Sequence, residues 1–334
     1  MRRVLFVFPT EWDRRQLAAC RDRWEDEYEV VFGEPADSDW CWDMDVLAEI
    51  DRLVEGWRGR VDGVTSSSDY PGAAVAAAVA GALGLPGSRP EAVVGCSHKF
   101  HCRRLQARVA PAAVPPFALL DPTRPPSSLD EVGFPCFVKP VKGSFSVQTR
   151  KVESIDELAS FLRSPAVHEF LGWYTKVFDR LVRRWLGESH ARFFLAEGLL
   201  RGEQVTVEGF VSGGEVEHLG IVDSVMHSGT RSFRRFDFPS ALPAEVQARM
   251  ASVVRRIVPA IGLSETMFNV ELMYDPATGA AHVIEVNPRL CGQFADLYEK
   301  VDGTNGYLVA LALATGRRPR LARGAGPCRV ASSH

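Results

Sequence analysis

The sequence lacks the features that mark several large classes of protein. It has no Gly-x-Gly-x-x-Gly fingerprint of a dinucleotide-binding turn and no Cys-x-x-Cys pair. The seven cysteines are scattered and odd in number, which argues against a disulfide framework and against a zinc cage, and fits a reducing cytoplasm. We find no internal repeat and no low-complexity segment.

An excess of charge of one sign and a long hydrophobic run are also missing. The 39 Lys and Arg residues nearly balance the 42 Asp and Glu residues, so nucleic acid is a poor candidate for the main ligand. The longest run of small apolar residues, 73–85, falls short of the roughly 20 residues that a membrane-spanning helix needs. The first apolar run is too short for a signal peptide. We expect a cytoplasmic protein without a membrane partner, and a homodimer is an open alternative to a monomer.

The composition, with 46% hydrophobic and 24% charged residues over 334 positions, allows two or three packed units. Three β-type runs, 4–8, 28–32 and 61–65, alternate with segments of helical length, which predicts an open α/β domain with a parallel sheet. The serine-rich stretch 66–70 follows the third run. Residues 66–70, with Ser68 among them, could face a substrate beyond the strand end, or the serines could cap the next helix. The sequence leaves both readings open.

The stretch 266–290 carries the most information. Two apolar-rich runs, 267–274 and 281–286, flank the turn-forming residues Asp-Pro-Ala-Thr-Gly, which predicts an antiparallel hairpin. If the turn centres near Ala277 and Thr278, paired positions sum to about 556. Glu271 then lies opposite Glu285. The intervening apolar residues require a core on the other face of the sheet; they are Val270, Leu272, Val283 and Val286.

The same register sets Asn269 opposite Asn287, and the alternation of side chains brings both residues to the face of Glu271 and Glu285. Two opposed carboxylates repel each other, so a cation between them is favoured over a purely structural pair. Oxygen ligands from two carboxylates and an amide suit Mg²⁺. Without metal, we expect the pKa of at least one of the two glutamates to be raised. The alternative is a solvated face whose acids point to water.

The run Glu-Val-Asn-Pro-Arg at 285–289, with Glu271 fourteen residues before it, resembles the metal-binding signature of the ATP-grasp superfamily. The resemblance implies an ATP-grasp fold, of mixed α/β and α+β class, behind an N-terminal open parallel-sheet domain of the Rossmann-like type. It implies that Glu271, Glu285 and Asn287 hold Mg²⁺ against ATP, and that Mn²⁺ can take the place of Mg²⁺. Arg289 would reach the transferred phosphate or the acyl intermediate.

Other motifs follow in the order of this family. Lys99, in a segment predicted to be helical over 96–109, stands where the family has a lysine that reaches the phosphates; the alternative is a surface lysine. Lys139 ends a predicted strand and resembles the family's second phosphate lysine. The loop after it, with Gly143, Ser144 and Ser146, resembles the loop that covers the phosphates. Where the family loop commonly has a second glycine, this chain has Phe145 and Ser146.

The segment 193–208 resembles the hinge that binds adenine and ribose. The resemblance assigns adenine to Glu197 and to the backbone of Gly198, Leu199 and Leu200. It assigns the ribose to Gln204, where the family more often has glutamate, with Glu203 beside it. An amide can still hydrogen-bond a diol.

The resemblance further implies an ADP-forming carboxylate-amine ligase, in which Lys139 and Arg289 act on an acylphosphate that an amine then attacks. The alternatives are a small-molecule kinase and a non-catalytic nucleotide sensor. The sequence does not identify the acid or the amine. We expect contacts with the substrate from a cluster of arginines and from one serine, and the alternative for the arginines is a solvated loop; the residues are Arg231, Arg234, Arg235 and Ser68.

Taken together, the motifs divide the chain into a first α/β domain at 1–110, a proline-rich linker at 111–131, a small lobe at 132–200 and a large lobe at 201–334. An apolar stripe from Phe170 to Leu186 predicts a helix. The tail from Gly316 is rich in Arg, Gly and Pro, and the sequence leaves open whether it is loose or ordered.

Overall fold

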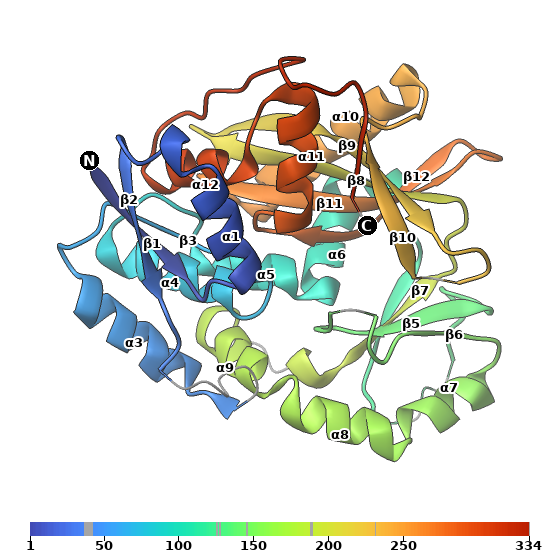
Figure 1. The fold of residues 1–334 in the computed structure, drawn as a ribbon. Coiled ribbons are helices and arrows are strands. Elements are labelled where there is room, and N and C mark those ends of the chain that lie inside the picture. The colour runs from blue at the N-terminus through green and yellow to red at the C-terminus, as the bar shows by residue number, and fades with distance from the viewer. Residues whose placement is uncertain are drawn as a thin grey trace.

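The first sheet belongs to the N-terminal part of the chain. A computed structural model describes residues 1–36, 43–124, 126, 128–144, 146–187, 190–230 and 232–333 (Figure 1). Within it, three parallel strands pair in the order β2-β1-β3, which confirms the predicted parallel sheet. The strands are β1 (Arg2–Val7), β2 (Tyr28–Gly33) and β3 (Gly63–Thr65). The helices between and after them are α1 (Glu11–Ala19), the 3-10 turn η1 (Arg21–Arg23), α3 (Val46–Trp57) and α4 (Gly72–Leu83).

Two further helices, α5 (Pro90–Ser97) and α6 (Lys99–Val109), follow α4. The single helix expected over 96–109 is wrong in one respect, because the chain breaks at His98. That residue leaves helical geometry, and its Nδ1 accepts a hydrogen bond from the backbone N–H of His101 at 3.1 Å, which caps α6. The break places Lys99 in the first turn of α6.

A four-stranded antiparallel sheet with the order β4-β7-β5-β6 comes next. Its strands are β4 (Phe117–Leu120), β5 (Cys136–Pro140), β6 (Arg150–Val152) and β7 (Phe194–Gly198). The stretch 111–131, expected to be a linker, therefore also contributes an edge strand, because β4 pairs along its length with β7. The 3-10 turn η2 (Pro111–Ala113) precedes β4.

Helices α7 (Ile155–Leu162), α8 (Pro165–Trp173) and α9 (Lys176–Trp185) lie between β6 and β7, followed by the 3-10 turn η3 (His190–Arg192). The helix expected from 170 to 186 is interrupted at Tyr174 and Thr175. The Thr175 hydroxyl donates to the carbonyl of Leu171 at 2.7 Å at this junction. The apolar stripe is buried on both sides of the break, as expected of core packing.

The six-stranded sheet is the largest and has the order β12-β11-β8-β9-β10-β13. Its strands are β8 (Glu203–Ser212), β9 (Glu215–Met226), β10 (Phe233–Phe238), β11 (Thr266–Asp275), β12 (Ala280–Asn287) and β13 (Ala331–Ser333). Helix α10 (Ala244–Ile261) leads into β11, and α11 (Gly292–Asp302) and α12 (Gly306–Ala314) follow β12.

The two faces of this sheet differ in what covers them. Val270, Leu272, Val283 and Val286 are at most 3% exposed and share a core with the apolar stripe of α10, as the hairpin pattern predicted. On the opposite face, α11 packs its Phe294 against Phe236 and its Tyr298 against Phe238. The face that carries Glu271 is therefore covered only in part by a helix.

The tail is not loose. Its last strand, β13, pairs antiparallel with β10, and the Arg323 guanidinium donates to the carbonyls of His218 and Leu219. The Thr304 hydroxyl donates to the carbonyl of Ala322 at 2.7 Å. These hydrogen bonds fasten the segment after α12 across the large sheet, where Figure 1 shows it in dark red.

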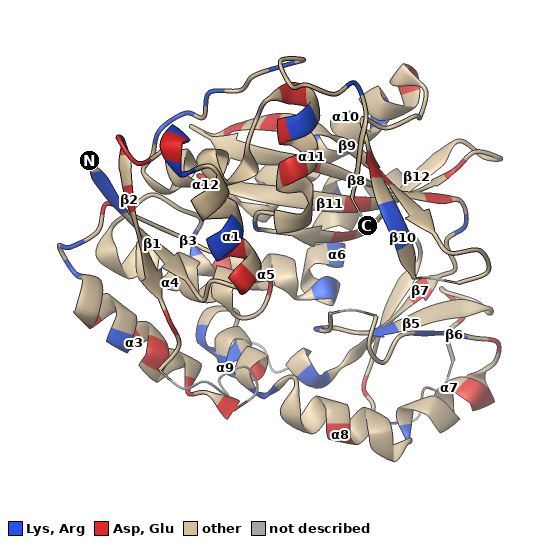
Figure 2. Cartoon of the chain, viewed as in Figure 1, with Lys and Arg blue, Asp and Glu red and all other residues tan. Residues whose placement is uncertain are grey.

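Within the described ranges, we find no helix long and apolar enough to cross a bilayer. Acidic and basic positions are interspersed over the visible elements (Figure 2), in keeping with the formal net charge of -3.

Candidate functional site

The hairpin of β11 and β12 has the predicted register at its polar end. Glu271 pairs with Glu285 and Asn269 with Asn287, which confirms that two carboxylates lie opposite each other. A β-bulge directly beyond Glu271 shifts the remaining pairs by one residue. The Asn287 amide donates to Asn269 Oδ1 at 2.8 Å and to Glu271 Oε1 at 3.3 Å. Because both contacts use its nitrogen, its amide oxygen is turned away from these two neighbours.

The two carboxylates differ in their electrostatics. Burial, followed by the charge of Glu285, raises the pKa of Glu271 to about 8. Burial opposes ionisation of Glu285 as well, but Lys99 and Lys139 outweigh it and lower the pKa of that carboxyl. The expectation that at least one pKa is raised without metal is confirmed. A pair that cannot ionise fully by itself fits a site completed by a cation.

The donor set also limits which cation fits. Among the residues that the structure describes, no group of three or more His, Cys, Asp and Glu side chains could hold a metal ion. Glu271, Glu285 and the Asn287 oxygen supply hard oxygen ligands only, and fewer than a divalent cation requires. This set suits Mg²⁺ whose remaining ligands come from water and phosphate oxygens.

The two lysines predicted to bind phosphate, Lys99 and Lys139, both contact this end of the hairpin. Lys99 Nζ lies 3.2 Å from Glu285 Oε2 and donates to the carbonyl of Gly143 at 2.9 Å. Lys139 Nζ, on β5, lies 2.6 Å from Glu197 Oε2 and donates to the carbonyl of Ile284 at 3.1 Å. Lys99 therefore joins the Glu285 carboxylate to the loop after β5, and Lys139 joins β5 to β7 and β12.

A third cation, Arg103 on α6, completes a buried triad with Lys139 and Glu197. Its Nε donates to Glu197 Oε1 at 2.7 Å, and its other nitrogens donate to Gln106 and to the carbonyls of Val283 and Ile284. The side chains of all three members of the triad are at most 6% exposed. Burial alone would raise the pKa of Glu197, but Arg103 and Lys139 lower it.

The loop after β5 docks onto the N-terminal part of the chain through Asp69. Lys142 Nζ lies 3.1 Å from Asp69 Oδ2, and the Ser144 hydroxyl donates to the same oxygen at 3.1 Å. Arg289 Nε lies 3.8 Å from Asp69 Oδ1. The Tyr174 hydroxyl donates to Ser144 Oγ at 2.9 Å. One carboxylate thus contacts the loop that follows β5 and the arginine that follows β12.

Lys142 is also enclosed by aromatic rings. Its ammonium lies 5.1 Å from the centre of the Tyr70 ring and 5.8 Å from that of Phe178. The Tyr70 hydroxyl donates to the carbonyl of Tyr174 at 3.0 Å and accepts from the backbone N–H of Phe178 at 2.8 Å. Cation–π contacts with two rings hold the lysine in a nearly buried position.

The structure brings most of the predicted nucleotide-site residues to this region. Gly143 and Ser144 lie in the contacts above, whereas Ser146 is exposed with a φ of +57°. Leu199 and Leu200 follow β7, and the Gly198 N–H donates to Pro116 O at 2.9 Å. Glu203 is exposed at the start of β8.

Gln204, predicted to contact a ribose, takes a different partner in the structure. Its amide donates to Glu271 Oε2 at 2.9 Å. The residue therefore lies beside the predicted metal carboxylate, so a ribose contact would have to share it with Glu271.

The predicted substrate residues are not all brought together. Arg231 lies outside the described residues. Arg234 is exposed on β10. Arg235 pairs with Asp237 at 2.9 Å, and the strand register places it on the sheet face opposite Glu271. Ser68 remains near the site, next to Asp69, with its hydroxyl 3.5 Å from the carbonyl of Tyr70.

Three charged residues of the cluster were not among the predicted site residues: Asp69, Arg103 and Lys142. Asp69 lies in the stretch 66–70, which the strand-end rule had selected as a possible substrate contact, but only Ser68 was chosen from that stretch as a site residue. Lys142 follows Lys139 by three residues, and only its neighbours Gly143 and Ser144 were selected. Arg103 follows Lys99 by one helical turn, which puts both on one side of α6.

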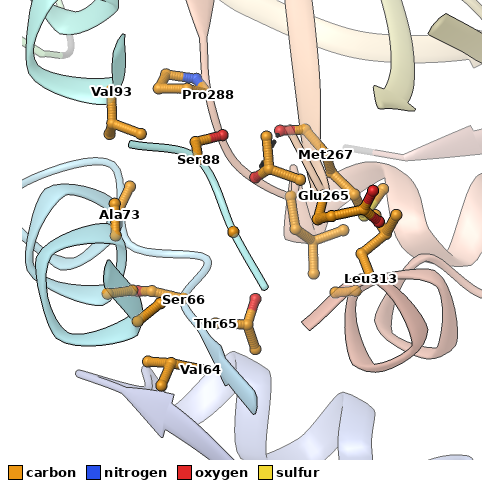
Figure 3. Close-up of a pocket in the computed structure, with 17 residues that line it drawn as sticks. Val64, Thr65, Ser66, Ala73, Ser88, Val93, Glu265, Met267, Pro288 and Leu313 are labelled. Carbon is orange, nitrogen blue, oxygen red and sulfur yellow. Dashed lines mark hydrogen bonds between the residues drawn. The ribbon is translucent and has the colours of Figure 1, made fainter. Parts of the chain in front are cut away.

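A hollow lies between the end of β3 with α4 and the start of β11 (Figure 3). Val64, Ser66 and Ala73 line it on one side and Glu265, Met267 and Leu313 on the other. The Ser66 hydroxyl donates to Val7 O at 2.8 Å and the Ser88 hydroxyl to Ser264 O at 2.9 Å, so these lining hydroxyls are hydrogen-bonded to backbone. Its lining mixes small apolar side chains with polar groups, Glu265 among them.

Comparison with known proteins assigns the class. Residues 132–296 match the family model described as the ATP-grasp domain, so the chain carries an ATP-grasp domain over this region. The predicted resemblance is confirmed. So is the fold class, an ATP-grasp fold with an additional three-stranded parallel sheet.

Individual proteins are similar over different lengths. The chain is 28% identical over 248 residues to the uncharacterized protein y4rH of Sinorhizobium fredii (strain NBRC 101917 / NGR234), which is 74% of this chain and 47% of that protein. It is 39% identical over 84 residues to carnosine synthase 1 of Gallus gallus, 25% of this chain and 9% of that protein. The chain thus spans about half the length of the first of these relatives and less of the second.

Among solved structures, the L-amino acid ligase from Bacillus licheniformis superposes with a TM-score of 0.71 at 20% identity, covering 94% of this chain and 74% of that one. Similarity at this level of identity shows a shared fold.

Proposed function

We propose that the protein is an ATP-dependent carboxylate-amine ligase that releases ADP and phosphate. The observation that carries this proposal is the pair of opposed carboxylates, Glu271 and Glu285, beside the amide of Asn287 and within reach of Lys99. The ATP-grasp domain over 132–296 supports it, as do similarities to proteins named an L-amino acid ligase and a carnosine synthase.

The proposed chemistry proceeds through an acylphosphate. A substrate carboxylate attacks the γ-phosphorus of ATP, ADP leaves, and the amine nitrogen then attacks the acyl carbon and expels phosphate. Lys99 and Lys139 hold phosphates, and Arg289 stabilises charge on the transferred group. Glu197 and 198–200 hold adenine, and Gln204 with Glu203 faces the ribose. The protein contributes positioning and charge neutralisation rather than a covalent intermediate of its own.

Glu271, Glu285 and Asn287 would hold Mg²⁺, or Mn²⁺ in its place. The bound cation would neutralise phosphate charge and relieve the repulsion between the two carboxylates. The substrate site would lie beyond the carboxyl ends of the N-terminal parallel strands, next to Ser68 and near Arg289. We propose small carboxylic acids and amines of the amino-acid or peptide type as substrates.

The substitution Glu285→Gln tests this proposal. We expect it to lower phosphate release by two orders of magnitude or more, because it removes a charged metal ligand, and to leave the circular dichroism spectrum unchanged. Glu217→Gln is the matched control, since Glu217 is 29% exposed against 28% for Glu285. Glu217 lies on β9 and pairs with Arg318, which follows α12. Full turnover in Glu285→Gln would remove the metal assignment.

A panel of amino-acid pairs with Mg-ATP, read by ³¹P NMR and mass spectrometry, identifies the reaction. The proposal predicts ADP, free phosphate and a new amide. A phosphorylated acceptor without free phosphate would show a kinase instead, and bound nucleotide without turnover would show a sensor.

A further inference from the structure

The carboxylate of Asp69 lies near cations from two distant parts of the chain, the loop after β5 and the segment after β12. Its Oδ2 receives Lys142 Nζ and the Ser144 hydroxyl, each at 3.1 Å. Its Oδ1 faces Arg289 Nε at 3.8 Å, which is too long for a hydrogen bond. Burial alone would favour the neutral acid, but Lys142, Arg289 and Lys99 lower the pKa of this carboxyl far below its usual range.

Two of these cations, Arg289 and Lys99, are groups that the proposed function directs at phosphate. Arg289 would contact the transferred phosphoryl group, and Ser144 lies on the loop that would cover it. Lys99 would hold the phosphates, and its charge also acts on Asp69. The site therefore contains an anion-binding position made of at least one guanidinium, two ammonium groups and a hydroxyl. The Asp69 carboxylate occupies this position.

We propose that Asp69 occupies the position of the γ-phosphoryl group and competes with it, so that Asp69 is a positioning residue that sets the preference between ATP and ADP. This inference rests on the proposed function. When ATP binds, its γ-phosphoryl oxygens take over Arg289 and Ser144, and the Asp69 carboxylate must withdraw from them because two anions repel at short range. ADP lacks the γ-phosphoryl group and leaves the contacts of Asp69 in place.

Competition between Asp69 and the γ-phosphoryl group predicts a pattern of nucleotide affinities that differs from the pattern expected if Asp69 only held the loop in place. Removing the charge of Asp69 should tighten binding of a nucleotide with three phosphates and leave one with two phosphates unchanged. If Asp69 served only to hold the loop after β5 in place, its loss would weaken both nucleotides or neither.

Isothermal titration calorimetry of the full chain with Mg-AMPPNP and with Mg-ADP tests the inference. We expect Asp69→Asn to bind AMPPNP on the order of tenfold more tightly, because one like charge leaves a largely buried site. Its affinity for ADP should stay within about twofold of wild type. Asp69→Glu, which keeps the charge, should restore the wild-type ratio. Asp69→Ser is a second neutral variant in case Asp69→Asn does not fold.

Asp296→Asn is the matched control. Asp296 is 31% exposed against 26% for Asp69, and it pairs with Lys300 at 2.6 Å on α11. Its removal should move neither affinity. Looser or unchanged AMPPNP binding in the neutral Asp69 variants, or equal shifts for both nucleotides, would overturn the inference. If wild type itself bound neither nucleotide, the proposed function would fall first, which separates the two failures.

Discussion

Replacing Glu197 by glutamine would remove the single negative charge from between two buried cations. In the wild-type protein, the Glu197 carboxylate accepts from Lys139 at 2.6 Å and from Arg103 at 2.7 Å. In the variant, both cations remain buried, and their like charges repel each other without the carboxylate between them. Breaking a buried ion pair by removing one partner costs about 3–5 kcal/mol, because the remaining charge is left uncompensated.

The effect on the melting temperature follows from the size of the chain. An unfolding entropy of about 2.1 cal/mol/K per residue over 334 residues gives roughly 0.7 kcal/mol/K at the midpoint. A loss of 3–5 kcal/mol should therefore lower Tm by about 4–7 °C. The carbonyls of Val283 and Ile284 still accept from Arg103 in the variant, which limits the loss.

Differential scanning calorimetry at pH 7 without nucleotide provides the measurement. Glu153→Gln is the control, because Glu153 is 62% exposed and its pair with Lys151 should contribute less than about 1 kcal/mol. If Glu197→Gln lowered Tm by no more than the control, the triad would not stabilise the junction of α6, β5 and β7 as inferred here.

Three further outcomes are expected. Burial, followed by the charges of Arg255 and Arg323, lowers the pKa of His218 to about 4. As the pH falls, the unfolded chain protonates His218 before the folded chain does. The free energy of unfolding should therefore fall between about pH 6.5 and 4, by roughly 1–2 kcal/mol after allowance for partial exposure. His218→Gln should flatten the slope of Tm against pH, and an unchanged slope would refute the lowered pKa of His218. Mg-ATP should protect the segment 142–150 from limited proteolysis. Equal cutting with and without Mg-ATP would contradict the prediction that the loop after β5 covers the phosphates. At pH 7, Mg²⁺ with ATP should release protons from Glu271, whose pKa is about 8 without metal; identical calorimetric heats in buffers of different ionisation enthalpy would show that no proton leaves.

The hairpin shows how much of the site could be predicted from sequence. Turn residues between two β-type runs set the register, and period-two alternation then placed Glu271, Glu285 and Asn287 on one face. The β-bulge beyond Glu271 could not be predicted, because an extra residue in one strand leaves the apolar pattern almost unchanged. The bulge does not change the pairing of Glu271 with Glu285, because it lies between this pair and the turn.

Contacts between distant segments were beyond sequence reasoning. Asp69 and Lys142 are 73 residues apart, and nothing local to either residue indicates the other. Arg235 shows a related limit. Its place in an arginine-rich stretch suggested a ligand site, but the side of the sheet that it faces depends on a register shift between β9 and β10. The order of the tail could not be predicted for the same reason, because the pairing of β13 with β10 depends on a partner strand about 95 residues earlier in the chain.

Strand β12 lies at the edge of the six-stranded sheet, so its outward carbonyls have no neighbouring strand. Side chains of the site cover them instead: Arg103 and Lys139 bind Ile284 O, and the Cys96 thiol donates to Val286 O at 3.3 Å. An uncovered edge of this kind invites strand addition from a second chain. Lys139, which we assign to phosphate binding, therefore also covers this edge together with Arg103. Neutralising either residue should lower solubility, and neutralising Lys139 should lower activity as well.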